Sequence, residues 1–291
     1  MPSGDIDREL DWARNEGPVR TIIIPPCPEL LTRLQAAMAS DDPDWQDICD
    51  IASADVAMAA SLVRAANSPL YARRSAAQSV EQAMALLGLR QCAALLTQFL
   101  SVRALRVNHP ALERFWESST RRAFAMGYIA RQLYGTPPDL AHTFGLFCDV
   151  GIPLLLQGLP GYAGTLAEAR ARRDRSFTET EQAAHRTDHS IVGALVARTW
   201  RLAPELKVAL RLHHDADALH DQRIDDGIRT LLAVCVVADH LVQSYEGNPD
   251  HAEWQQRGAD CLARLQVNEH ELLQWQDKLH DDFGQLGTAQ A

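Results

Sequence analysis

The chain has 291 residues, of which 46% are hydrophobic and 23% are charged, and its formal net charge is −10. This length and balance fit one large or two small globular domains, with enough core to fold without disulfides or metals. The acidic balance argues against a nucleic-acid surface and against an anionic membrane surface as partners.

The six cysteines are scattered and form no CxxC pair, which is typical of small buried thiols in a reducing compartment. Residues 1–17 are polar and lack a signal-peptide core, so they predict a polar N-terminal tail. The longest apolar run, 231–238, is too short to span a membrane. We therefore expect a cytoplasmic protein with no membrane partner.

Helical periodicity fills the first half of the chain, apart from a short apolar stretch at 21–26. Asp42 is expected to cap a helix that ends near residue 51, and Asp55 to cap the next one. That second helix should end at the proline of "NSPLY", residues 67–71. Ser79 and Gln82 form a capping-box pattern, and Gly88 should end the helix that they begin. A long helix is expected over about 91–105.

Helices are also predicted throughout the second half. Their expected ranges are 111–134, 139–157, 162–173, 179–199, 204–214, 227–245 and 255–281. The residues after about 245 are expected to form one or two amphipathic helices that either close the core or present an interaction face. The pattern predicts an all-α fold.

A few polar residues fall on apolar helix faces. Asp149 lies in "HTFGLFCDVGIPLL", Asp239 lies in "TLLAVCVVADHLV", and His213 follows the apolar face of the helix before it. His189 opens an almost wholly apolar helix. Carboxylates and imidazoles of this kind are the ligands of a borderline metal. Each residue taken alone is more simply a helix cap or a hydrogen-bonded core residue, and spacing does not show that they converge.

Several segments in series resemble the HDOD family, a bacterial signalling relative of the HD phosphohydrolases. They are "IPPCPELLTRLQAAM", "ADVAMAASLVRAANSPLY", "SVEQAMALLGLRQCAALL", "FWESSTRRAFAMGYIARQL", "FGLFCDVGIPLLLQGLPGYAGTL" and "ETEQAAHRTDHSIVGALVARTWRLAPELKVALRLHHD". The resemblance covers roughly residues 20–240. It implies an N-terminal helical bundle, 18–110, packed on a pseudo-HD helical core, 111–245, with C-terminal helices over 246–291.

The resemblance also implies a remnant HD site. Two positions that carry histidine in catalytic relatives hold other residues here, Ser118 and Cys148, and Ile152 stands where a phosphate-neutralising lysine is common. The positions that match the family's site residues are Ser118, Cys148, Asp149, Glu181, His189, His213, His214 and Asp239. The "GYP" motif of cyclic-dinucleotide phosphodiesterases is absent, and "PGYAG" at 160–164 has similar letters in another order.

These departures favour a site without hydrolysis, because serine is a poor ligand for a divalent metal and cysteine suits magnesium or manganese badly. No catalytic residue and no cofactor are expected, and a hydrogen-bonded network is favoured at the remnant site. The alternative is a single divalent metal held by Asp149, His189, His213 and His214.

The resulting expectation is a non-catalytic HDOD regulatory module that acts through contacts with signalling proteins in trans. Binding of nucleic acid is not expected, and association as a homodimer is left open. Two alternatives remain. One is a metal-dependent phosphohydrolase acting on a nucleotide or a cyclic dinucleotide with a reduced metal site. The other is a nucleotide sensor without cleavage, with phosphate clamps from the arginine groups at 73–74, 121–122 and 170–175.

Overall fold

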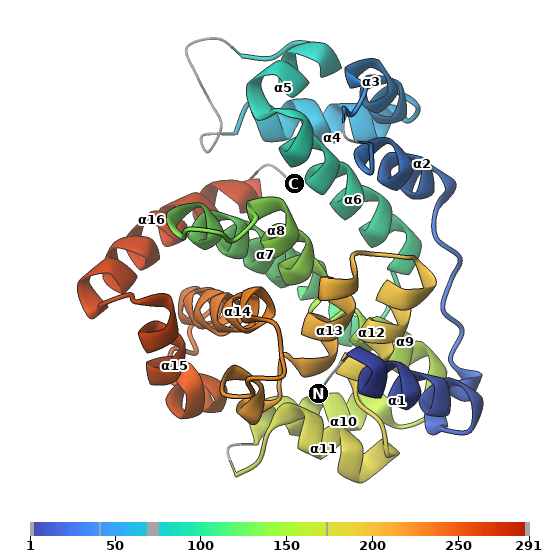
Figure 1. Cartoon of the computed structure of the whole chain (residues 1–291), viewed down its shortest axis with the longest axis vertical. Coiled ribbons are helices and arrows are strands. Elements are labelled where there is room, and N and C mark those ends of the chain that lie inside the picture. The colour runs from blue at the N-terminus through green and yellow to red at the C-terminus, as the bar shows by residue number, and fades with distance from the viewer. Residues whose placement is uncertain (1–2, 41, 69–75, 173, 289–291) are drawn as a thin grey trace. The chain divides into compact units, whose positions relative to one another are not determined.

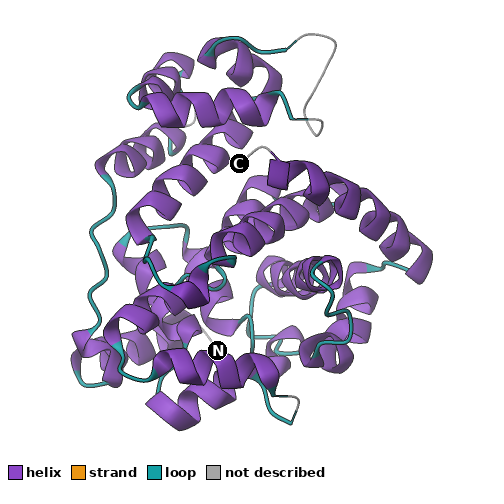
Figure 2. Ribbon diagram, turned by 180° about the vertical axis from the view of Figure 1, so that it is seen from behind, coloured by secondary structure: helices purple, strands orange, loops and turns teal. Residues whose placement is uncertain are grey.

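The computed structural model describes the chain except for residues 1–2, 41, 69–75, 173 and 289–291 (Figure 1). Every regular element among the described residues is an α-helix or a short 3-10 helix (Figure 2). The predicted all-α class is confirmed. The expected end of a helix at Pro69 and the arginines at 73–74 fall outside the described residues.

The contacts divide the chain into two compact units, which are described separately. The smaller unit holds residues 26–106 and 277–291. Its first helices are α2 (Glu29–Met38), α3 (Trp45–Ser53), α4 (Val56–Ala66), α5 (Val80–Leu87) and α6 (Leu89–Leu105). Their core is apolar and fully buried at residues such as Leu34, Ile48 and Met58. Helix α16 (Glu269–Thr288) begins in the larger unit and ends in the smaller one.

The larger unit holds residues 1–25 and 107–276. Helix α7 packs along α8, and α14 packs against both α7 and α15. Helix α12 packs against α9 and α13. The elements are α1 (Ser3–Asn15), α7 (Phe115–Gln132), α8 (Pro138–Phe147), α9 (Gly151–Gly158), α10 (Tyr162–Ala171), α11 (Phe177–His185), α12 (His189–Thr199), α13 (Pro204–Leu212), α14 (Asp226–Tyr245) and α15 (Ala252–Leu265).

The helix caps agree with the sequence at three of four positions. Asp55 accepts hydrogen bonds from the first backbone amides of α4, and Ser79 accepts one from Gln82 at the start of α5. Gly88 ends α5 with a positive φ of 79°, a conformation that glycine adopts without strain. The prediction for Asp42 is wrong, because Asp44 is the residue whose carboxylate accepts from the amide of Gln46 at the start of α3.

Two helices predicted as continuous are each broken. The range 139–157 forms α8 and α9 with a turn at 148–150, and the range 179–199 forms α11 and α12. Arg186 ends α11 in the left-handed conformation, and the carboxylate of Asp188 caps α12. Both breaks lie beside residues of the predicted site. At these points a turn interrupts the helix that the apolar periodicity had predicted.

The predicted polar tail at 1–17 is corrected. Residues Ser3–Asn15 form helix α1, whose Ile6, Leu10 and Ala13 are almost fully buried. Its polar face forms ion pairs with α12 and α13, among them Glu9 with Arg211. The spacing of these three apolar residues was the signal in the sequence that the polar composition obscured.

Two apolar stretches, 138–158 and 226–245, are long and apolar enough to cross a bilayer by length and composition, and the bent pair of α5 and α6 also qualifies. About 72% of each of the two stretches is buried inside the protein. Helices that are apolar on most faces are expected in a protein core as well as in a membrane.

The contact between α9 and α12 is made by backbone. A Cβ atom added at Gly151 would lie 2.2 Å from the carbonyl oxygen of His189. We predict that Gly151→Ala lowers the free energy of unfolding by about 1–3 kcal/mol, because two buried helix ends would have to separate. Gly164→Ala, in α10, is the control, since nothing lies within 4 Å of its added Cβ. Urea unfolding of both variants measures the difference, and equal stabilities would contradict the close approach.

Candidate functional site

Asp149 lies in the turn between α8 and α9 rather than inside a helix. The close approach of Gly151 to the backbone of His189 brings this turn against the first residue of α12. Asp149 and His189 are 40 positions apart in sequence, yet Asp149 Oδ1 lies 3.5 Å from His189 Nε2. The carboxylate therefore faces the start of α12.

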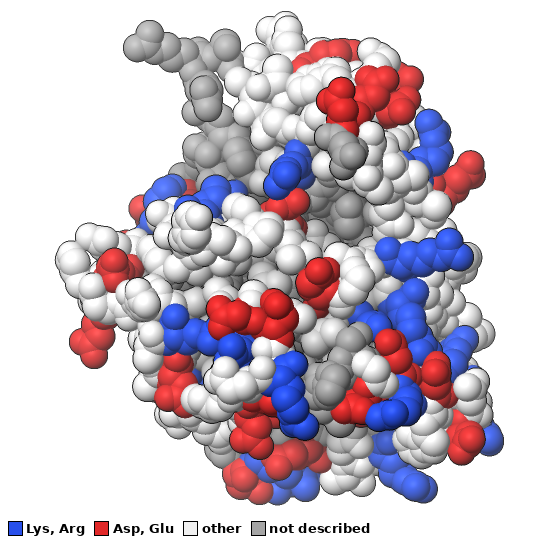
Figure 3. Space-filling model, in the orientation of Figure 1, with Lys and Arg blue, Asp and Glu red and all other residues white. Residues whose placement is uncertain are grey.

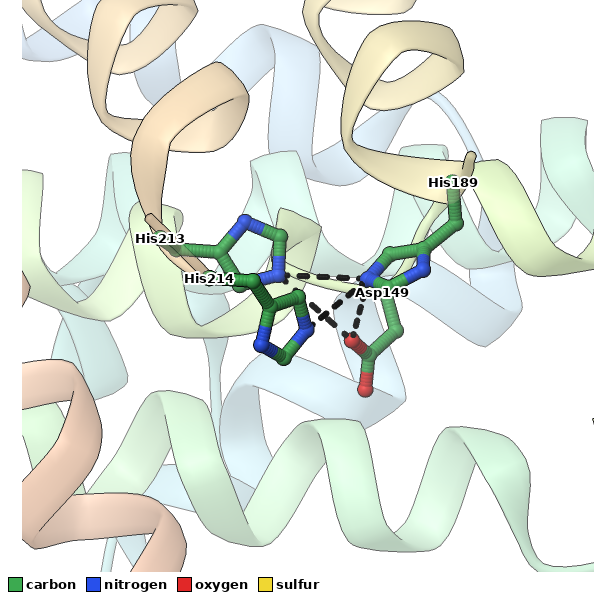
Figure 4. A group of neighbouring side chains, drawn as sticks. All are labelled: Asp149, His189, His213 and His214. Atoms are coloured by element: carbon green, nitrogen blue, oxygen red, sulfur yellow. Dashed lines mark hydrogen bonds and ion pairs between the residues drawn. The ribbon is translucent and has the colours of Figure 1, made fainter. Parts of the chain in front are cut away.

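The two other histidines of the predicted site follow the end of α13, which lies beside the start of α12. His213 follows the last residue of α13 and His214 comes next, where the helix has ended. Figure 4 shows their imidazoles approaching the ring of His189 from one side, with the Asp149 carboxylate facing the same point. The structure thus brings together Asp149, His189, His213 and His214.

The four side chains meet through one atom each, and these atoms all lie within 4.8 Å of one another. His189 Nε2 is 3.1 Å from His214 Nε2 and 3.3 Å from His213 Nε2. Asp149 Oδ1 lies 3.9 Å from His213 Nε2. The donors come from three separate segments, so only the fold assembles them.

The other ring nitrogen of each histidine has an acceptor of its own. His189 Nδ1 donates to Glu181 Oε2 at 2.7 Å, and His213 Nδ1 donates to the carbonyl oxygen of Leu210 at 2.7 Å. His214 Nδ1 lies 3.2 Å from a carboxylate oxygen of Glu253. A carbonyl or carboxylate oxygen only accepts, so the proton of each neutral ring belongs on Nδ1. Each Nε2 then points a lone pair at the centre of the group.

Three lone pairs and a carboxylate oxygen at these separations repel one another unless a positive charge lies among them. A tetrahedral metal with bonds of about 2.0–2.1 Å to nitrogen requires ligand atoms roughly 3.3 Å apart. The separations of 3.1, 3.3 and 3.5 Å from His189 Nε2 fit that requirement. The 3.9 Å between Asp149 Oδ1 and His213 Nε2 is longer, and all four atoms lie within 4.8 Å of one another. An imidazole whose second nitrogen is held by a carboxylate is also the usual environment of a metal-ligating histidine. The donor set fits one borderline divalent metal such as zinc.

A proton is the other positive charge that the group can hold. Burial is the largest influence on His189 and disfavours its charged form, yet the Glu181 carboxylate, with Asp149, raises the pKa of His189 to about 9. Burial and the neighbouring His214 lower the pKa of His213 to about 4. Without a metal, His189 is therefore the imidazolium at neutral pH and its Nε2 proton is shared among the group.

Asp149 has a second partner on its far side. Its Oδ2 accepts a hydrogen bond from Arg122 of α7 at 2.7 Å, and the same guanidinium lies 3.0 Å from Asp239 Oδ1 in α14. The Arg122 side chain is 9% exposed. Burial opposes ionisation of Asp149, but Arg122 and the histidines hold the pKa of that carboxyl well below its usual range. Asp239 therefore meets Asp149 through a shared guanidinium and does not join the histidine group directly.

Two further predicted positions lie near the histidine group without joining it. The Ser118 hydroxyl, one turn before Arg122 in α7, donates to Glu246 Oε1 at 2.6 Å. Cys148 Sγ lies 3.3 Å from Cys235 Sγ of α14, and burial is the main cause that raises the pKa of Cys148. Neither residue contributes an atom to the group of four donors. Glu181 is fully buried and acts one step away, through His189.

The site opens into a cavity of about 710 Å³. Its lining includes the four donors, Arg122 and Asp239. It also includes Arg170, Arg172 and Arg175, which were considered as phosphate clamps. Arg172 pairs with Glu168 and Asp174, and Arg175 pairs with Glu168. Arg121 likewise pairs with Glu117 and Glu246. These pairings engage Arg121, Arg172 and Arg175 within the chain and weaken the case for a phosphate clamp at these three residues.

The family model of the HDOD domain matches residues 24–216. The chain belongs to the HDOD family. The resemblance inferred from sequence is confirmed, and the HDOD match includes all four donors. Asp239 and Glu253 lie beyond its end.

The chain is similar to a curated relative, an uncharacterised protein of Treponema pallidum (strain Nichols). It is 25% identical over 197 residues, which are 66% of this chain and 38% of that protein. The chain thus spans well under half of the length of this curated relative. Activities and partners of the longer protein do not follow for this chain.

Three solved structures share the fold. A protein of Marinobacter aquaeolei VT8, provisionally named for signal transduction, has a TM-score of 0.77 at 17% identity, covering 99% of this chain and 68% of its own. A provisionally named phosphohydrolase of Shewanella amazonensis SB2B has a TM-score of 0.72 at 19% identity, covering 98% of both chains. An HDOD protein of unknown function from Geobacter sulfurreducens has a TM-score of 0.72 at 20% identity, covering 97% and 99%. At these identities the likeness is one of fold.

Sequence reasoning missed two residues that bear on the HDOD site, Glu253 and Arg257. It named Arg122 only as part of a possible phosphate clamp at 121–122, whereas the structure pairs this residue with Asp149 and Asp239. Arg122 is four positions after Ser118, so it lies on the same face of α7, and this spacing was available in the sequence. Glu253 and Arg257 lie outside the resemblance, and only the packing of α15 against α14 brings them to His213 and His214.

A bound metal and a bound proton should give the protein different dependences of its unfolding free energy on pH. Without metal, the raised pKa of His189 contributes stability that is complete below pH 6.5 and is lost towards pH 9, about 3 kcal/mol at most. The lowered pKa values of His213 and Asp149 act in the opposite direction, and their contribution is lost as the pH falls. With metal bound, His189 is neutral when folded, and the alkaline loss should vanish.

Urea unfolding at pH 6.5, 7.5 and 9, with a chelator or with Zn²⁺, measures both curves. His189→Gln is the control and should lack the alkaline loss in chelator. Identical alkaline slopes with and without zinc would show that a proton, rather than a metal, occupies the centre of the group.

Proposed function

We propose that this chain is a non-catalytic HDOD signalling module that acts through protein contacts and holds one divalent metal at Asp149, His189, His213 and His214. The arrangement of three Nε2 atoms and one carboxylate oxygen supports the metal. The single-metal alternative is proposed in place of the expectation of no cofactor, because each Nδ1 faces an oxygen acceptor and the three Nε2 atoms converge with the carboxylate oxygen on one point.

The observation that carries the non-catalytic proposal is the position of Arg122. Its guanidinium lies between Asp149 and Asp239, the two aspartates that the family resemblance assigns to the HD site. A buried arginine remains charged, and it supplies positive charge where a second cation would need both carboxylates. The site therefore has room for one exchangeable cation, and the other position is filled by the chain itself.

The residues that stand in place of the family's histidine and lysine also favour a site without hydrolysis. The Ser118 hydroxyl is engaged by Glu246, and Ile152 is a buried apolar residue that offers no charge to a phosphate. When bound, a divalent metal at the four donors supplies a Lewis acid and structural cross-linking of the turn at 148–150 with α12 and α13. Glu181 orients His189, and Arg122 keeps Asp149 ionised.

The proposed partners are signalling proteins supplied in trans. On the face drawn in Figure 3, basic and acidic side chains are intermixed, so this face has no broad field of one sign. Such a surface suits protein contacts better than it suits the phosphate backbone of a nucleic acid. Self-association as a homodimer is compatible with the proposal.

The test combines metal content and activity on the full chain. Purified without chelator, the wild type should carry roughly one metal per chain, and Asp149→Ala should lose it. The loaded protein should not hydrolyse cyclic dinucleotides, nucleotides or generic phosphodiesters with manganese, nickel, iron or magnesium. Turnover that disappears in Asp149→Ala would overturn the non-catalytic proposal and establish the phosphohydrolase alternative. A wild-type protein purified without bound metal would overturn the proposed metal site.

The role of Arg122 gives a separate prediction. In chelator, Arg122→Ala should lower the free energy of unfolding by about 3–5 kcal/mol, because two buried carboxylates lose their shared partner. Magnesium or manganese should then stabilise this variant more than the wild type, since the two carboxylates are oxygen ligands that such ions prefer. Thermal melts with and without these ions measure the effect.

Arg103→Ala is the matched control, because Arg103 also pairs with an aspartate, Asp55, but its side chain is 66% exposed. It should change stability little and respond to no ion. An Arg122→Ala protein that is as stable as the wild type in chelator would contradict the proposed charge replacement.

A further inference from the structure

We propose that Glu253, on helix α15, is a positioning residue for the metal, so that the centre is completed by a helix outside the HDOD segment 24–216. This inference rests on the proposed function, since it assumes that a metal binds at the four donors. It assigns to the C-terminal region a specific task at the site.

His214 is the donor that most needs such support. Its side chain is 17% exposed, whereas His189 and His213 are 0% and 3% exposed. His189 is held by the buried Glu181 and His213 by a carbonyl of its own helix. His214 lies beyond the end of α13, so no helical hydrogen bond fixes its backbone in the same way.

A histidine can present either ring nitrogen to a metal, and the partner of the other nitrogen decides which one faces it. Glu253 Oε2 lies 3.2 Å from Nδ1 of His214. The carboxylate therefore selects the tautomer with its proton on Nδ1 and turns the Nε2 lone pair towards His189 Nε2, 3.1 Å away. The ring of His214 also lies parallel to that of Phe177, at 6° between planes. A 180° flip of the imidazole would keep this plane but exchange its two edges, and the contact of Nδ1 with Glu253 opposes that flip.

Glu253 is itself fixed from the same helix. Arg257, one turn later in α15, donates to Glu253 Oε1 at 2.6 Å and to the carbonyl oxygen of His213 at 2.7 Å. The Arg257 side chain is 5% exposed. One guanidinium thus ties the carboxylate that orients His214 to the backbone of the preceding ligand. Helix α15 fixes both histidines of the pair.

It follows that metal affinity depends on the docking of α15, and that metal binding stabilises this docking in return, because such coupling is reciprocal. The helix also packs along α14, which carries Asp239. Displacement of α15 would leave the Nδ1 of His214 without its acceptor while the donors within residues 24–216 remain.

The experiment measures zinc affinity of the full chain by competition with a chromogenic chelator, together with the visible spectrum of the cobalt-loaded protein. Glu253→Ala should weaken zinc binding about 10–100-fold, the usual effect of removing the partner of a ligating histidine. Glu253→Gln should weaken it less, because its amide oxygen still accepts from Nδ1. Both variants should change the shape of the cobalt spectrum, which reports the ligand geometry.

Asp260→Asn is the matched control, because Asp260 lies on the same helix and also faces a histidine, His220 at 3.3 Å, but on an exposed surface. It should bind zinc and cobalt as the wild type does. Glu253 variants with wild-type affinity and spectrum, or an equal loss in Asp260→Asn, would overturn this inference while leaving the metal centre intact. A wild type that binds no metal overturns the proposed function and this inference together.

Discussion

The convergence of three imidazole Nε2 atoms and one carboxylate oxygen is the constraint on which the larger unit depends. These atoms lie 3.1 to 3.9 Å apart in the measured pairs, which is too close for unprotonated donors without a positive charge between them. The chain holds them there with hydrogen bonds to the outer ring nitrogens and with the turn at 148–150. Such an arrangement costs free energy unless a cation or a proton offsets it.

The positive charges around this centre differ in how permanent they are. Arg122 is a permanent internal cation that joins Asp149 to Asp239. His189 is a cation only below its raised pKa of about 9. A bound metal would be the third and exchangeable one. Because the first of these is built in, Asp149 stays ionised whatever the centre holds. The ionised state of Asp149 is therefore independent of what the centre holds.

The sequence predicted the class of fold and most helix positions, because apolar spacing and capping residues are local signals. Asp55 and Gly88 act as expected. The break at 148–150 was missed because apolar residues continue through it. The break after His185 lies in a polar stretch, where Asp188 caps the next helix, and this capping signal was overlooked. The tail at 1–17 was misread because its few apolar residues are outnumbered by polar ones.

The sequence indicated which residues gather at the candidate site better than it indicated the contacts between them. The family resemblance marked Asp149, His189, His213 and His214, which the fold assembles into one group. It did not indicate that Asp239 meets Asp149 through Arg122, because a buried arginine has no signature that distinguishes it from a surface one. The contribution of α15 could not be read from sequence either, since it depends on tertiary packing beyond the matched segment.

The contact of Gly151 with the carbonyl of His189 has a consequence for how such a protein can change over evolutionary time. The spacing between Asp149 and His189 is set by main chain meeting main chain, with no side chain between them. Neighbouring side chains are therefore not needed to hold these two segments together. Side-chain substitutions at positions such as Cys148 or Ser118 therefore leave this backbone contact between the two segments in place.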